Sequence, residues 1–134
     1  MISIQAGDVD IGELIRKAKQ PGTGAIVVFD GIVRDDDIRE MELEAYRDVA
    51  EKELEGIAAD AREKFGLLSV DIVHRVGRLK VGENILVTVV GAGHRNEAYE
   101  GSRYIIEGIK AGVPIWKKEM RKEGDRWVKG EDPR

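Results

Sequence analysis

Two lysines in the last quarter of the chain are spaced so that they can act on one ligand. The segment IKAGVPIWKKE (109–119) places Lys110 at the expected end of a helix and Lys117 on the strand that follows. Taken alone, a lysine at a helix C-terminus is a favourable partner of the helix dipole, and lysines on a hairpin usually belong to a solvated face. Pro114 stands between the two stiff elements and would fix the lysines relative to each other, as a built anion site requires.

A second candidate for anion binding is the pair His94 and Arg95. In VVGAGHRNEAYEG (89–101) a buried strand meets a glycine turn and then the start of a helix. Unpaired N–H groups and the positive end of the helix dipole favour an anion at such a start, and phosphate is a natural ligand. The alternative is that Gly91 and Gly93 simply permit the turn and that His94 is structural.

The third candidate is FDGIVR (29–34), in which Gly31 inside a strand indicates a bulge or a close backbone approach. Phe29 either covers a planar ligand or belongs to the core. Arg34 either clamps a phosphate or pairs with the neighbouring aspartates. A further basic pair, His74 and Arg75, lies within a strand-like run, and we interpret it as structural.

Composition limits the classes of protein to which the chain can belong. Its length of 134 residues suits a single domain over 1–134. A net charge of −4 argues against nucleic-acid binding, and the absence of cysteine excludes zinc–thiolate and iron–sulfur sites and any thiol intermediate on this chain. Sulfur chemistry would need sulfur from another molecule.

The apolar runs are too short to span a bilayer, and the N-terminus lacks a secretion signal, so we expect a cytoplasmic protein with no membrane contact.

Hydropathy patterns predict the elements that must position these residues. We expect strands over residues 2–5, 24–34, 41–45, 70–73 and 83–93, helices over 11–18, about 48–66 and about 96–111, and a C-terminal hairpin of 115–120 with 126–129. The order is not the regular alternation of a doubly wound fold. It predicts an α+β domain with a mixed or antiparallel sheet and two to three helices.

Some boundaries have a specific chemical signal. Asp8 or Asp10 is expected to cap the first helix, and Asp48 with Glu51 resembles a capping box for the second. The strand over 41–45 is expected to pair with the strand before it.

Three segments together, F-x-G-x-V-R, then HR at a helix start, then K-x(3)-P-x-W-K, resemble the large subunit of molybdopterin synthase. Three further motifs also match the family and stand in its order: HRVG (74–77), VGE (81–83) and EGDRWV (123–128). The resemblance therefore spans nearly the whole chain. It implies a sulfurtransferase that converts cyclic pyranopterin monophosphate to molybdopterin in molybdenum cofactor biosynthesis, without a cofactor or metal.

The resemblance also implies partners and roles for residues. The family forms a homodimer with a small ubiquitin-like sulfur-carrier subunit at each end, a heterotetramer, and the carrier's C-terminal Gly-Gly thiocarboxylate enters a pocket on the large subunit. By position, Lys110 and Lys117 match the catalytic lysines. The substrate-binding residues of the family match Phe29, Arg34, His94 and Arg95. A late arginine that reaches across the dimer in relatives is replaced by Glu131.

Two other functions could use the same basic residues: a transfer enzyme and a binding module. A nucleotide- or acyl-transfer enzyme that cradles a pyrophosphate is disfavoured, since the strict G-x-G-x-x-G spacing and an acidic ribose-binding residue are missing. A non-catalytic binding module or sensor for an anionic pterin or nucleotide would use the same basic residues without turnover.

Overall fold

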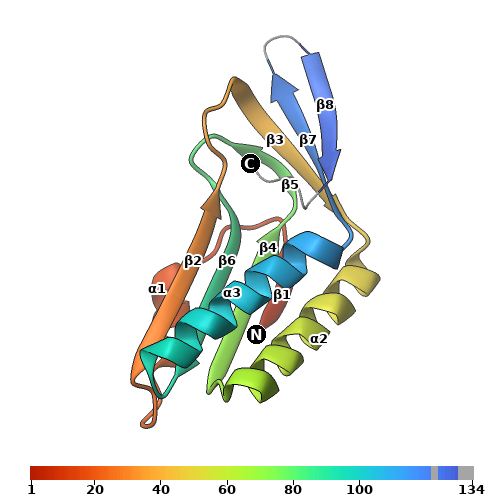
Figure 1. Cartoon of the computed structure of the whole chain (residues 1–134). Helices are drawn as coiled ribbons and strands as arrows, with labels where there is room; N and C mark the ends of the chain where they lie inside the picture. The colour runs from red at the N-terminus through yellow and green to blue at the C-terminus, as the bar shows by residue number, and fades with distance from the viewer. Residues whose placement is uncertain (122–123, 130–134) are drawn as a thin grey trace.

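The computed structural model describes residues 1–121 and 124–129 (Figure 1). Three helices and eight strands are formed there, which agrees with the α+β prediction. No helix in this part of the chain is long and apolar enough to cross a membrane. In chain order the elements are β1 (Ile2–Gln5), α1 (Ile11–Ala18), β2 (Ala25–Ile32), β3 (Ile38–Ala45), α2 (Arg47–Phe65), β4 (Ser69–Arg75), β5 (Gly77–Lys80), β6 (Asn84–Ala92), α3 (Arg95–Gly112), β7 (Ile115–Arg121) and β8 (Gly124–Lys129).

The strands form two four-stranded sheets rather than one. The first has the order β1-β4-β6-β2 and is mixed, because β1 runs parallel to β4 while the other pairs are antiparallel. The second has the order β5-β3-β7-β8 and is antiparallel. In Figure 1 the second sheet lies above the first, beyond the C-terminal end of α3. The predicted C-terminal hairpin is confirmed as β7 and β8.

The predicted pairing of the 41–45 strand with its predecessor is wrong. β2 pairs with β6, whereas β3 crosses to the second sheet and lies between β5 and β7. This placement buries Met41 and Leu43 in the same core cluster as Leu79 of β5 and Ile115 of β7. β5 itself was not predicted, because its sequence GRLK offers one apolar side chain in a four-residue strand.

Local chemistry accounts for the start of α1 and the end of α2, but not for the start of α2. Asp10 is the N-cap of α1 and accepts a hydrogen bond from the N–H of Glu13 at 3.1 Å, which confirms one of the two predicted caps. Gly66 ends α2 in the left-handed conformation, with φ of 64°. The capping box at Asp48 is wrong, since the N-cap of α2 is Tyr46 and its side chain forms no capping hydrogen bond.

Helices cover both faces of the first sheet. α1 packs on one face, where Leu14 and Ala18 meet three valines of β4 and β6. α2 and α3 cover the other face, and their apolar side chains join the cluster that contains Met41 and Leu43 of the second sheet. Residues of both sheets therefore share one core, and the C-terminal end of α3 lies where the two sheets meet.

Candidate functional site

A pocket of about 170 Å³ lies where the two sheets meet the last turns of α3. Lys110 reaches it from α3, Lys117 from β7, Phe29 from β2 and His74 from β4. The remaining lining is Gly31, Ile32, Leu43, Ile85, Leu86, Ile109 and Ile115. The structure thus brings together both lysines and the aromatic residue that the sequence singled out.

The connection between α3 and β7 holds the two lysines in place. It consists of Val113 and Pro114. The N–H of Val113 donates to the carbonyl of Ile109 at 3.3 Å. β7 is an interior strand, since Lys117 stands opposite Leu43 on one side and Val128 on the other. Both lysines are half-buried. Their backbone positions are fixed relative to each other, as the position of Pro114 predicted.

Lys118 lies on the other face of β7. Its Nζ is 5.7 Å from the centre of the Trp127 ring, a cation–π distance, and it does not line the pocket. Adjacent residues of a strand point to opposite faces, which separates Lys118 from Lys117. The two adjacent lysines are therefore a matched pair, one inside the pocket and one outside it.

Phe29 belongs to the core, one of the two options that the sequence left open, and it is also part of the pocket. Its ring packs against the core cluster and also lines the pocket. The register of β2 with β6 shifts between Gly31 and Ile32, which confirms the predicted irregularity. A Cβ on Gly31 would lie 3.2 Å from the Phe29 ring, so a side chain at position 31 would crowd that ring.

Arg34 is not among the described residues that line the pocket, but it lies close to one of them in the chain. Its side chain is exposed, and Ile32, two residues earlier, lines the pocket. Two residues of extended chain span at most about 7 Å, which limits the distance between their Cα atoms. A long guanidinium side chain attached there can reach a ligand that projects from the pocket.

His94 and Arg95 lie at the opposite end of α3 from this pocket. Arg95 begins the helix and Lys110 is in its last turn, a separation of about 22 Å along the helix axis at 1.5 Å per residue. The His94 side chain is 89% exposed, and its Nδ1 lies 3.8 Å from a carboxylate oxygen of Glu97. Within one copy of the chain, these residues and the two lysines cannot contact the same small ligand.

The glycines before His94 allow backbone segments to approach each other. A Cβ on Gly24 would lie 2.2 Å from the carbonyl oxygen of Gly93, and a Cβ on Gly91 would lie 2.5 Å from Oγ of Ser69. Neither Gly91 nor Gly93 has a positive φ. Gly91 therefore permits close packing against Ser69, whereas a Cβ on Gly93 would lie 3.9 Å from the nearest atom, so the close approach at Gly93 depends on Gly24.

His74 lines the pocket, although its place in a strand-like run indicated a structural role. Its side chain is 6% exposed, and its Nδ1 lies 2.9 Å from the carbonyl oxygen of Arg75. Burial lowers the pKa of His74 to about 4; the hydrogen bond with Arg75 opposes this change, and the nearby charge of Lys117 adds to it. The imidazole is therefore neutral at pH 7.

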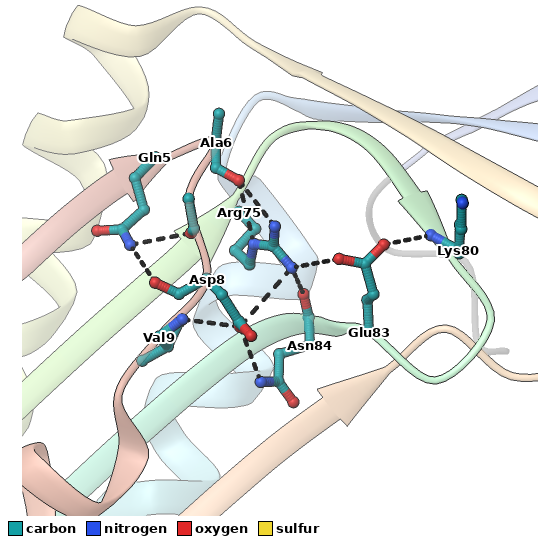
Figure 2. Close-up of polar contacts among 9 residues, drawn as sticks. Gln5, Ala6, Asp8, Val9, Arg75, Lys80, Glu83 and Asn84 are labelled. Carbon is teal, nitrogen blue, oxygen red and sulfur yellow. Dashed lines mark hydrogen bonds and ion pairs between the residues drawn. The ribbon is translucent and has the colours of Figure 1, made fainter.

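Arg75, by contrast, is structural, and Figure 2 shows its contacts. Its guanidinium donates to the carbonyl of Ala6 at 2.8 Å, to the carbonyl of Asn84 at 3.3 Å and to the carboxylate of Glu83 at 3.2 Å. Asp8 adds a longer ion pair at 3.7 Å. These contacts join β4 to Asn84 of β6 and to Ala6, the residue after β1, and they fix the carbonyl that orients the His74 ring.

Strand alternation was the signal that separates His74 from Arg75. Adjacent residues of a strand point to opposite faces, so two basic neighbours cannot act as one unit. His74 shares its face with Ile72, a member of the core cluster under α2 and α3, whereas Arg75 points to the other face.

The pocket combines apolar walls with two ammonium groups and one neutral imidazole. Apolar walls lower the local dielectric constant, which strengthens the attraction of the lysines for an anion. Preorganised positive charge of this kind stabilises anionic intermediates most. The arrangement suits a narrow, negatively charged group that enters from the surface and reacts between Lys110 and Lys117.

Comparisons with known proteins point to one family. The family model described as MoaE protein matches residues 4–112. The chain is similar to the molybdopterin synthase catalytic subunit of Pyrococcus abyssi, with 41% identity over 92% of this chain and 86% of the relative.

Solved structures agree in fold. The crystal structure of molybdopterin synthase from Staphylococcus aureus matches with a TM-score of 0.88 and 35% identity, covering 93% of this chain and 94% of that one. A chain in the complex of subunits 1 and 2 of molybdopterin-converting factor from Helicobacter pylori matches with a TM-score of 0.79 and 25% identity, covering 98% of this chain and 91% of that one.

Proposed function

This chain belongs to the MoaE protein family, and we propose that it is the catalytic subunit of a molybdopterin synthase, a sulfurtransferase of molybdenum cofactor biosynthesis. The observation that carries the proposal is the convergence of Lys110, Lys117 and Phe29 on one pocket. These three residues come from separate segments of the motif set, yet the fold places them together.

The pocket of one protomer suits the end of a sulfur-carrier protein. At about 170 Å³ it is smaller than the roughly 300–1,000 Å³ of typical small-molecule sites. A Gly-Gly tail has no side chains and fits a narrow channel, and its thiocarboxylate is an anion that two lysines attract. The partner is thus a separate small ubiquitin-like subunit, and the related two-subunit complex from Helicobacter pylori supports this assignment.

The pterin precursor, cyclic pyranopterin monophosphate, then lies at the mouth of the pocket, where Arg34 can bind its phosphate. His94 and Arg95 are too distant in the same protomer. We infer that they serve the pocket of the second copy in a homodimer, which with two carriers makes a heterotetramer. The replacement at Glu131, which the resemblance connects with a cross-dimer contact, lies outside the described residues.

Lys110 and Lys117 act where negative charge develops. The carrier's thiocarboxylate sulfur attacks the substrate, and the carrier remains attached through an acyl–sulfur bond until water cleaves it. Ammonium groups at the pocket stabilise the thiocarboxylate and then the oxyanion formed at the acyl carbon. Two carriers deliver two sulfurs for each molybdopterin.

The test is reconstitution of the purified chain with thiocarboxylated carrier and pterin precursor, followed by detection of the dithiolene product. Product that depends on all three components supports the proposal. Tight binding of the precursor without sulfur incorporation, given a carrier that is active with a known synthase, would instead identify a sensor or binding module.

We also propose a single domain and a cytoplasmic location for the chain. The core shared by both sheets supports a single domain over 1–134. The cytoplasmic location is a prediction that fractionation of expressing cells tests.

A further inference from the structure

Among the described residues that line the pocket, one side chain, His74, can accept a proton at neutral pH. In the part of the chain that the structure describes, eleven residues line the pocket, and of these Lys110, Lys117 and His74 are the ones with polar side chains. An ammonium group donates hydrogen bonds and has no lone pair, whereas a neutral imidazole has one donor nitrogen and one acceptor nitrogen. Of the described lining residues, His74 is therefore the side-chain base available to a reaction that must remove a proton.

The tautomer of His74 is set by its neighbour. A backbone carbonyl can only accept, so the nitrogen 2.9 Å from the Arg75 carbonyl, Nδ1, carries the hydrogen. Nε2 then holds the free lone pair. In the described part of the chain, this bond to Arg75 is the only hydrogen bond of the ring, which leaves Nε2 available to the pocket.

The surroundings keep Nε2 unprotonated. Burial, opposed by the bond with Arg75 and assisted by the charge of Lys117, holds the pKa of His74 at about 4. The charged side chains that face it across the pocket are Lys110 of α3 and Lys117 of β7, while its strand partners Ile4 and Leu86 are apolar. An anion bound between the lysines offsets their charge and makes His74 a stronger base.

We propose that His74 is the catalytic base of the step that frees the carrier: Nε2 takes a proton from the water that attacks the acyl carbon of the carrier–substrate conjugate. The inference rests on the proposed function. The water oxygen forms a bond to the acyl carbon, the acyl–sulfur bond breaks, and the electron pair of that bond leaves with sulfur. His74 returns its proton to the sulfur, and the carboxylic acid formed on the carrier loses its own proton to solvent.

The fold gives this base a fixed position. β4 is held between β1 and β6, and the guanidinium contacts of Arg75 tie the next residue to Ala6 and Asn84 (Figure 2). A rigid acceptor that faces two lysines is the arrangement needed to polarise water beside a developing oxyanion.

His74→Gln tests the proposal, because glutamine keeps a polar acceptor but is not a base. In a single turnover with thiocarboxylated carrier and precursor, the variant should form the conjugate at the normal rate and hydrolyse it about 10²-fold or more slowly. Intact-protein mass spectrometry follows the conjugate. Ser69→Ala, a polar position on the same strand but outside the pocket, is the matched control and should hydrolyse it normally.

Each outcome decides one claim. Hydrolysis at the normal rate in His74→Gln overturns the base assignment, and so does an equal loss in both steps, which indicates a structural role. If the unmodified chain forms neither conjugate nor product, the proposed function itself fails.

A second measurement needs no variant. Conjugate hydrolysis by the unmodified chain should be independent of pH between 6 and 8, because His74 is already deprotonated there. A rate that rises about tenfold per pH unit across that range would assign the base to hydroxide or to a lysine and overturn the proposal.

Discussion

Lys110 and Lys117 reach one pocket from two elements, α3 and β7, that are joined by only two residues, Val113 and Pro114. The short connection makes the distance between the lysines a property of the fold rather than of flexible side chains alone. A helix C-terminus and a hairpin are each a common place for an exposed lysine. Here the two elements are consecutive, and the short connection directs both lysines into one pocket.

Lys117→Ala should reduce single-turnover sulfur transfer by about 10²–10³-fold, the usual loss of a preorganised group that stabilises developing negative charge. Carrier binding and the fold should be preserved. Lys118→Ala is the control, since Lys118 lies against Trp127 on the opposite face. Normal turnover in Lys117→Ala together with an inactive Lys118→Ala would refute the catalytic assignment.

Arg95→Ala should weaken binding of the precursor by about 1–3 kcal/mol, the loss of a charge-assisted hydrogen bond to its phosphate. Carrier affinity should not change, because Arg95 lies at the far end of α3 from the pocket. Titration calorimetry with each ligand separately measures both. Unchanged precursor affinity would mean that the phosphate binds elsewhere.

Mixing two impaired variants, at a precursor concentration too low to saturate the Arg95→Ala chain, tests whether the site spans two copies. If Arg95 serves the partner's pocket, a mixed dimer of Arg95→Ala and Lys117→Ala chains contains one intact site, and random mixing should restore about a quarter of normal activity. The control is a mixture of Lys110→Ala and Lys117→Ala, which should stay inactive because both lysines line one pocket. Equal activity in the two mixtures would place Arg95 in its own chain's site.

Features that depend on sequence neighbours were predictable. The cap at Asp10, the left-handed end at Gly66 and the strand irregularity at Gly31 each follow from the chemistry of one residue and its immediate context. The separation of His94 from Lys110 was also contained in the sequence, since a helix over 96–111 already implies more than 20 Å between its ends, by about 1.5 Å per residue.

Strand pairing was less predictable, because it depends on contacts between distant segments. β3 has the alternation of a half-buried strand wherever it pairs, so its pattern does not reveal that its neighbours are β5 and β7. The position of His74 in the pocket depends on this same arrangement: the second sheet supplies Lys117 and Leu43 as the facing wall. Sequence alone placed His74 on a strand but not opposite a lysine.

Arg75→Ala should destabilise the protein by about 2–4 kcal/mol, because it removes charge-assisted hydrogen bonds to Glu83 and to two carbonyls from a nearly buried guanidinium. Arg103→Ala removes an exposed ion pair with Glu107 and should cost no more than about 0.5 kcal/mol. Urea denaturation at pH 7 compares the two. Equal effects would show that the network of Figure 2 contributes little to stability.

The stability of the protein should fall as the pH is lowered from about 6.5 to 4, and His74 should cause much of this loss. The unfolded chain binds a proton at His74 near pH 6.5, whereas the folded chain resists protonation until about pH 4, so acid favours unfolding across that window. The difference corresponds to about 3 kcal/mol at 1.36 kcal/mol per pH unit. Asp8 and Glu83 have lowered pKa values, so their carboxylates stabilise the fold above about pH 4.5, and this stabilisation is lost as the pH falls below that value. Urea denaturation at pH 7 and pH 4.5 should therefore show a smaller pH effect in His74→Gln than in the unmodified chain, and identical pH effects would mean that His74 is not held neutral by the fold.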